Sequence, residues 1–105
     1  SNTILGSNYE NMPNEYLLHQ NYPNPFNPIT TLRYYVPEKI LVRISIFDIS
    51  GNLIKMLVNE DKNAGFYSAR WGAINNNGKP VSAGVYFYKI HAGNFVDTKK
   101  MILLK

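Results

Sequence analysis

The stretch Gly84–His91, with the sequence GVYFYKIH, decides the fold of this 105-residue chain. It is rich in β-branched and aromatic residues, follows the turn-rich segment INNNGKPVSAG and precedes a Gly-Asn pair, which is the pattern of a strand between tight connections. Because side chains alternate along a strand, Tyr86, Tyr88 and Ile90 share one face. The opposite face carries Lys89, so we expect the tyrosine face to be the buried one.

A two-residue turn at the Gly-Asn pair predicts an antiparallel hairpin that runs to the end of the chain. In that register Tyr86 lies opposite Met101, and Met101 and Leu103 share the tyrosine face. A slip by one residue would place Ile102 and Leu104 on that face instead. The sequence leaves both registers open.

Further strands are expected wherever apolar residues alternate between turn signals. They are a short one near Leu17–Gln20, then Thr30–Val36, Leu41–Ile49, Leu53–Val58, Phe66–Gly72 and a terminal strand that runs to Lys105. We expect the polar stretch NEDKNAG, which includes Glu60 and Asp61, to be a turn. Since no run has helical spacing, the pattern predicts an all-β chain folded as an antiparallel β-sandwich of about seven strands.

A chain of this length buries roughly 60–70% of its unfolded surface, which is enough for one core. The residues expected to have a structural role are large apolar or aromatic side chains on these strands and the glycine that begins the central one. They are Tyr34, Ile44, Ile46, Trp71, Gly84, Tyr86, Tyr88 and Ile90.

The N-terminal part has a different composition. Residues 1–16 are polar and rich in asparagine, so we expect a flexible linker that begins with a tag remnant, Ser1-Asn2, and a folded domain at residues 17–105. We also expect the chain to be a fragment from the end of a longer protein. Prolines at 23, 25 and 28 exclude a helix or a central strand there. Tyr22 and Phe26 are expected to anchor this segment on the sandwich; a proline-motif ligand for another protein is the alternative.

Composition excludes several classes of protein. There is no cysteine, so disulfides and thiolate metal sites are absent. The formal net charge is +4, but the basic residues are scattered, and the stripe typical of a nucleic-acid face is missing. No apolar run approaches the roughly 20 residues of a membrane helix, so membrane insertion is not expected. Lysines near the C-terminus are typical of a protected edge strand.

Catalytic and metal-binding patterns are also missing. His19 and His91 have no acidic residue or second histidine at ligand or relay spacing. There is no G-x-S-x-G turn and no phosphate-binding glycine loop. The loop Asn75–Gly78 contains no carboxylate, so it is interpreted as a turn rather than a calcium site. We therefore expect no enzyme activity, no metal and no cofactor.

The aromatic residues leave one alternative open. Tyr35, Phe47, Trp71 and Phe87 would suit an exposed platform for sugar rings, as in a carbohydrate-binding or spacer module of a secreted hydrolase. Sandwich cores contain aromatic residues in any case, which favours the core interpretation.

Several ordered motifs carry a resemblance to a known family. They are HQNYPNPFNPITTLRYYVPE, VRISIFDISGNLIKMLV, AGFYSARW, NGKPVSAGVYFYKIHAG and the closing TKKMILLK. From Leu17 to Lys105 the chain resembles the C-terminal sorting domains of type IX secretion substrates in Bacteroidetes, relatives of the immunoglobulin-like domain of the flagellar hook-capping protein. One departure lies after Trp71, where family members often have Asp-Gly and a further Asp, and this chain has Gly72-Ala73-Ile74-Asn75.

The resemblance implies an immunoglobulin-like, non-catalytic delivery module. An upstream cargo protein would cross the periplasm and pass through the type IX outer-membrane translocon to the cell surface or the medium. In many members a sorting peptidase then removes the domain, and we expect any such cleavage within Thr3–Tyr16. A scaffold module of a surface assembly is a further alternative.

Partner recognition is assigned to the terminal hairpin Gly84–Lys105, whose last strand would accept a partner strand by edge addition. The residues expected to make polar contacts are Lys99, Lys100 and Lys105. Those expected to give the surface its shape are Met101, Leu103 and Leu104.

Overall fold

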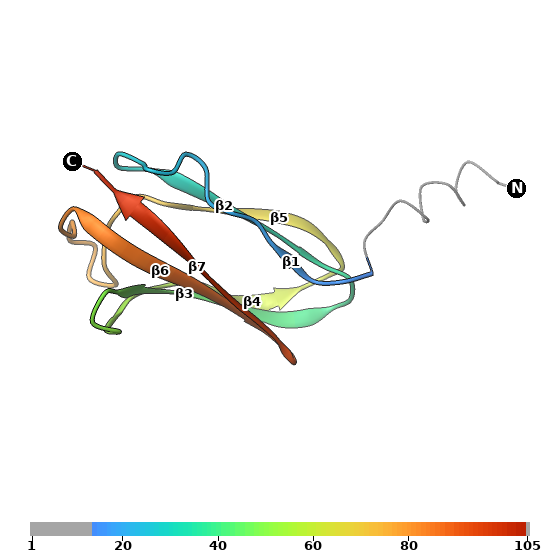
Figure 1. The fold of residues 1–105 in the computed structure, drawn as a ribbon. Coiled ribbons are helices and arrows are strands. Elements are labelled where there is room, and N and C mark those ends of the chain that lie inside the picture. Colours follow the sequence, from blue (N-terminus) through green and yellow to red (C-terminus); the bar gives the residue numbers. More distant parts are fainter. Residues whose placement is uncertain (1–13, 105) are drawn as a thin grey trace, which may run out of the picture.

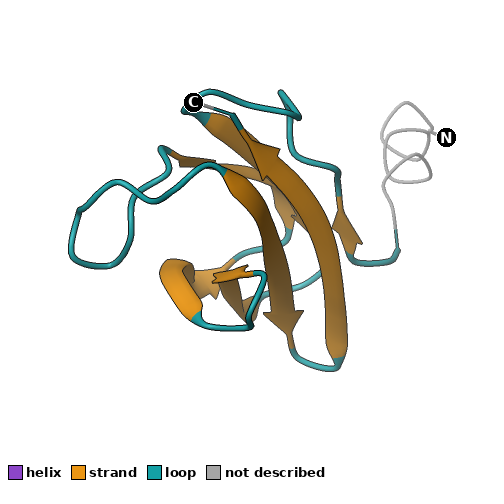
Figure 2. Ribbon diagram, turned by 60° about the vertical axis from the view of Figure 1, so that its left-hand side comes forward, coloured by secondary structure: helices purple, strands orange, loops and turns teal. Residues whose placement is uncertain are grey.

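The computed structural model describes residues 14–104, and within this range it contains seven strands and no helix. The strands are β1 (Leu17–Leu18), β2 (Thr30–Val36), β3 (Ile40–Asp48), β4 (Leu53–Lys62), β5 (Gly65–Trp71), β6 (Gly84–Ala92) and β7 (Phe95–Leu103). They form two antiparallel sheets, one with the order β1-β2-β5 and one with the order β4-β3-β6-β7. Figures 1 and 2 show the two sheets packed face to face. The predicted immunoglobulin-like sandwich of about seven strands is confirmed.

The strand β6 occupies an interior position of the four-stranded sheet, between β3 and β7. Tyr86 lies opposite Met101, as the two-residue turn predicts. Met101 and Leu103 are 0% and 1% exposed, whereas Leu104 is 52% exposed. The alternative register is therefore wrong, because it would bury Leu104 and expose Met101.

The core lies between the sheets. Trp71 of β5 packs edge-on against Tyr86 of β6, with ring centroids 5.4 Å apart, and its indole N–H donates to the backbone carbonyl of Ile74 at 2.8 Å. The other expected core residues, Tyr34, Ile44, Ile46, Tyr88 and Ile90, are buried as well. Full burial of an aliphatic side chain contributes about 1.5–3 kcal/mol, so this layer supplies most of the stabilising free energy. Gly84 is exposed and has φ +146°, a conformation that suits glycine.

The strand β4 is longer than predicted. It continues through Glu60 and Asp61 to Lys62, pairing with β3 as far as Ile40, whereas the sequence predicted a turn after Val58. Polar side chains are tolerated because β4 is an edge strand whose outer side meets solvent. The ion pair between Lys62 and Glu60, at 2.5 Å, lies within this extension.

The proline-containing segment between β1 and β2 is anchored by one aromatic residue and not by two. Phe26 is 2% exposed and packs against Trp71, with ring centroids 5.9 Å apart. Tyr22 is 70% exposed, so the expectation of a second anchor is wrong. Its backbone instead exchanges two hydrogen bonds of 3.0 Å with Thr31, which leaves the ring in solvent.

Candidate functional site

The terminal hairpin consists of β6, the turn Gly93-Asn94 and β7, and β7 is an edge strand of the four-stranded sheet. Gly93 adopts φ +60°, the left-handed conformation that a tight hairpin turn requires. Ala92 and Phe95 flank the turn as cross-strand partners. The outer edge of β7 is the surface to which a partner strand would add.

Half of that edge is already occupied by a segment that we call the covering segment, residues 20–26. Figure 1 shows the C-terminal end of β7 beside the loop between β1 and β2 that contains this segment. Four hydrogen bonds join the two. They run from Gln20 Nε2 to Lys100 O (2.8 Å), from Ile102 N to Asn24 Oδ1 (3.0 Å), from Phe26 N to Ile102 O (3.0 Å) and from Leu104 N to Phe26 O (2.8 Å).

These bonds show which main-chain groups of the last strand face outward. Residues 100, 102 and 104 turn their backbone groups away from β6, and alternation along the strand gives Val96 and Thr98 the same orientation. The N–H of Thr98 is taken by the Asp97 carboxylate at 2.9 Å. Strand addition along the whole of β7 is thus excluded in this fold, because residues 100–104 are covered. The uncovered part of the edge lies at Val96 and Thr98.

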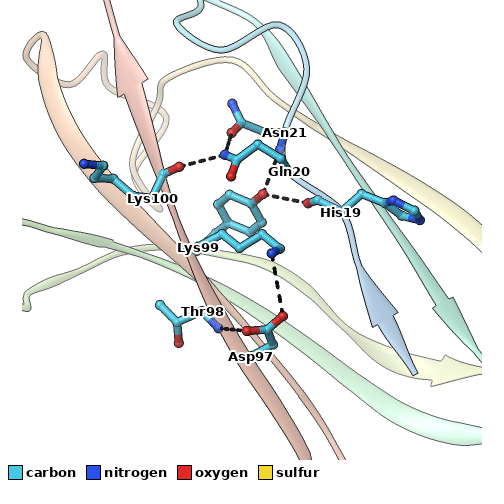
Figure 3. A network of polar contacts seen from close by, with 8 residues as sticks. His19, Gln20, Asn21, Asp97, Thr98, Lys99 and Lys100 are labelled. Carbon is cyan, nitrogen blue, oxygen red and sulfur yellow. Dashed lines mark hydrogen bonds and ion pairs between the residues drawn. The ribbon is translucent and has the colours of Figure 1, made fainter. Parts of the chain in front are cut away.

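The core residue Tyr88 anchors the covering segment through two hydrogen bonds of its hydroxyl. Its hydroxyl accepts a hydrogen bond from the backbone N–H of Asn21 and donates one to the carbonyl of His19, both at 2.7 Å (Figure 3). Burial raises the pKa of Tyr88 to about 12, which keeps the hydroxyl protonated as a donor. Asn21 is itself buried and donates from Nδ2 to Thr30 Oγ1 at 2.9 Å. The segment is therefore fixed through the core as well as along the edge.

The structure separates the residues assigned to partner recognition. Met101 and Leu103 point into the core, so a partner of the folded domain does not touch their side chains, and the expectation that they shape its contact surface is corrected. Lys100 and Leu104 are exposed. Lys99 is half-buried and faces Asp97, with an Nζ to Oδ2 distance of 3.9 Å (Figure 3). Lys105 lies outside the described residues.

The four aromatic residues of the alternative sugar-binding interpretation do not form a common exposed platform. Tyr35 and Trp71 are 3% and 1% exposed. Phe47 and Phe87 are half-buried cross-strand partners on the outer side of the four-stranded sheet. Sequence alternation alone does not distinguish buried from exposed aromatic residues, because both faces of a sandwich strand carry aromatic residues here.

The other candidate sites are a metal centre and the asparagine loop Asn75–Gly78. Within the part of the chain that the structure describes, no group of three or more His, Cys, Asp or Glu residues is arranged to hold a metal ion. Asn75 uses Oδ1 to accept the backbone N–H groups of Asn77 (2.9 Å) and Lys79 (3.0 Å), which is how it forms a turn. No helix in residues 14–104 is long and apolar enough to cross a membrane.

The fold and the covered hairpin define a class, a small immunoglobulin-like β-sandwich module whose C-terminal strand is an edge strand. Comparison with known proteins gives the family. Residues 20–104 match the model of the secretion system C-terminal sorting domain, and the chain belongs to that family. The resemblance drawn from the sequence motifs is thereby confirmed. As a member, the domain acts as a sorting signal, which implies the secretion machinery as its partner and transit to the cell surface or the extracellular space. No curated protein matches the chain.

Solved structures share the fold. Dimeric latent PorU from Porphyromonas gingivalis matches with a TM-score of 0.70 and 19% identity over 90% of this chain and 10% of that one. PorZ, described as an essential bacterial surface component of the type-IX secretion system of Porphyromonas gingivalis, matches with a TM-score of 0.57 and 19% identity over 84% of this chain and 11% of that one. Pseudomonas fluorescens AlkC, an alkylpurine DNA glycosylase, matches with a TM-score of 0.53 and 14% identity over 96% of this chain and 33% of that one. The chain therefore spans about a tenth of the first two proteins.

Proposed function

We propose that this domain directs an upstream cargo protein through a type IX outer-membrane translocon to the cell surface or the medium. The observation that carries the proposal is the family match over residues 20–104. The description of PorZ, a protein that shares the fold, as a component of a type-IX system supports the choice of secretion route. In this function residues 1–16 link the cargo to the domain, and the cargo crosses the periplasm before export. A sorting peptidase would cut within that linker, which lies largely outside the described residues.

Translocon recognition is proposed to use the terminal hairpin. The contact residues are Lys99, Lys100, Leu104 and Lys105. At the uncovered edge the N–H and C=O of Val96 and the C=O of Thr98 are open to a partner strand, whereas the N–H of Thr98 is bound to Asp97. Exposure supports this choice for Lys100 and Leu104. A β-sandwich that is stable without disulfides also suits a module that folds before export, because its folding needs no oxidant. The domain in this role binds and performs no catalysis, and it needs no cofactor.

The experiment is an export assay. The full 105-residue chain is fused behind a signal peptide and a reporter in a bacterium that has a type IX system, and surface reporter is measured. We expect the reporter at the surface or in the medium. Retention of a folded fusion in the periplasm would contradict the proposal. A fusion with Lys100→Gln and Leu104→Gln tests the hairpin, and a fusion with Lys39→Gln and Ile29→Gln, two exposed residues elsewhere, is the matched control.

A further inference from the structure

The outer face of the four-stranded sheet carries positive charges on three of its strands. On β3, β6 and β7 the side chains that point away from the core are Leu41, Arg43, Ser45, Phe47, Val85, Phe87, Lys89, His91, Val96, Thr98, Lys100 and Ile102. None of them is acidic, and three are Lys or Arg. The carboxylate that shares this face is Asp61 of β4, opposite Leu41 at one corner. The charged side chains at these positions of β3, β6 and β7 are therefore all positive.

The register arranges the three cations in a line. Arg43 pairs with His91, Ser45 with Lys89, and Phe87 with Lys100. Each step from Arg43 to Lys89 to Lys100 moves one strand across the sheet, about 4.8 Å, and two residues along it, about 6.7 Å, which gives a spacing of about 8 Å. We call these three residues the basic diagonal. All three are exposed, and the ion pairs found within residues 14–104 do not involve them.

Apolar side chains flank one end of the basic diagonal. Phe47 and Phe87 are direct cross-strand neighbours, and both are half-buried. Val85 and Ile102 form the next cross-strand pair along the sheet. A ligand that follows the diagonal would thus meet three positive charges and, at the Lys100 end, an aromatic surface that its own apolar side chains can cover.

We propose that the basic diagonal docks an acidic, extended peptide segment of a partner protein. In an extended chain, carboxylates two residues apart point to the same side at a spacing of about 6.7 Å, close to the spacing of the cations. Charge complementarity of this kind selects the partner and speeds its encounter with the domain. The partner's role in export rests on the proposed function, but binding itself is measured without export.

The test uses the full chain and a fluorescein-labelled peptide in which six aspartates alternate with six serines. The first variant combines Arg43→Gln, Lys89→Gln and Lys100→Gln. The control variant combines Arg33→Gln, Arg70→Gln and Lys79→Gln, which are exposed residues away from this face. Each set removes three positive charges from a formal net charge of +4, so attraction by net charge alone weakens equally in both.

Binding is followed by fluorescence anisotropy at about 50 mM salt, where surface charges are weakly screened. We expect the Kd to rise by about tenfold in the diagonal variant and by less than about twofold in the control. Equal losses in the two variants, or no binding by the wild-type chain, would overturn the proposal. Binding of heparin with the same dependence on the diagonal, without binding of the peptide, would overturn it too, in favour of an anionic polysaccharide. Equal melting temperatures show that the variants fold.

Discussion

The hydroxyl of Tyr88 lies 2.7 Å from the backbone nitrogen of Asn21, although the two residues are 67 positions apart in the sequence. The same hydroxyl donates to the carbonyl of His19 at 2.7 Å. A single oxygen on the central strand thus satisfies two main-chain groups, the N–H of Asn21 in the covering segment and the C=O of His19 just before it. The covering segment, which occupies residues 100–104 of the C-terminal edge, is therefore positioned from the core.

Removal of that oxygen should destabilise the domain. Tyr88→Phe leaves the ring in place but deprives the buried N–H of Asn21 of its acceptor, and we expect the free energy of unfolding to fall by about 1–3 kcal/mol. Chemical denaturation measures this loss. The control is Tyr67→Phe, which removes an exposed bond from the hydroxyl to the Asn63 carbonyl and should cost less than about 0.5 kcal/mol. Equal losses of unfolding free energy in the two variants would show that the buried hydroxyl of Tyr88 stabilises the domain no more than the exposed hydroxyl of Tyr67.

Alkaline pH should also weaken the fold. Burial raises the pKa of Tyr88 to about 12 and raises the pKa values of Tyr34 and Tyr86, from an ordinary value of about 10. Because the folded state disfavours the tyrosinate form, this contribution to stability is fully present below pH 10 and is lost as pH rises from about 10 to 12. Urea unfolding at several pH values, with tyrosinate absorbance recorded in parallel, measures the loss. In Tyr88→Phe the free energy of unfolding should fall less steeply with pH above pH 10. An unchanged slope would contradict the assignment of this pH dependence to Tyr88.

The contact of the covering segment with β7 can be tested one amide at a time. The N–H of Ile102 donates to Asn24 Oδ1, whereas the N–H of Leu104 donates to the backbone of Phe26. Asn24→Ala removes only the first acceptor. We expect hydrogen exchange at Ile102 to become about tenfold faster, with Leu104 changing by less than about threefold. If both amides exchange faster together, the segment detaches as a unit and Asn24 is its main attachment.

The hairpin turn depends on a glycine for two separable reasons. Gly93 has φ +60°, and a Cβ added there would lie 2.7 Å from Cδ1 of Ile40. We expect Gly93→Ala to destabilise the domain by about 1–2 kcal/mol, about 1 kcal/mol of it from the left-handed backbone. In an Ile40→Val background, which lacks Cδ1, only the backbone cost should remain, and a double-mutant cycle on unfolding free energies measures the difference. An identical cost in both backgrounds would show that Ile40 moves aside freely.

Local sequence patterns predicted the strands with strong alternation. GVYFYKIH and the Gly-Asn turn predicted β6 and its buried face, but they left two registers with β7 open. The structure decided between these registers, since Met101 and Leu103 lie in the core with the tyrosines. The pattern failed at β4, where Glu60 and Asp61 suggested a turn. Backbone pairing with β3 extends β4 to Lys62. Polar side chains do not reveal such pairing, because the side chains of an edge strand can face solvent while its backbone is hydrogen-bonded.

The candidate site was predicted less completely. Lys100 and Leu104 are exposed as expected, but Met101 and Leu103 were assigned by position in the last strand and lie in the core. The sequence gives no signal that residues 20–26 cover this edge, since Gln20 and Lys100 are 80 residues apart. It also does not reveal the basic diagonal, whose members come from three different strands.

By itself the sequence determined the family, the all-β class and the inward face of the central strand β6, because motifs, turns and alternation are local properties of the chain. Only the tertiary structure decided which part of the β7 edge stays uncovered and which basic residues form the diagonal. The alignment of the cations depends on the register of β3, β6 and β7. The extent of the open edge depends on the covering segment, which the hydroxyl of Tyr88 anchors from a distant part of the sequence.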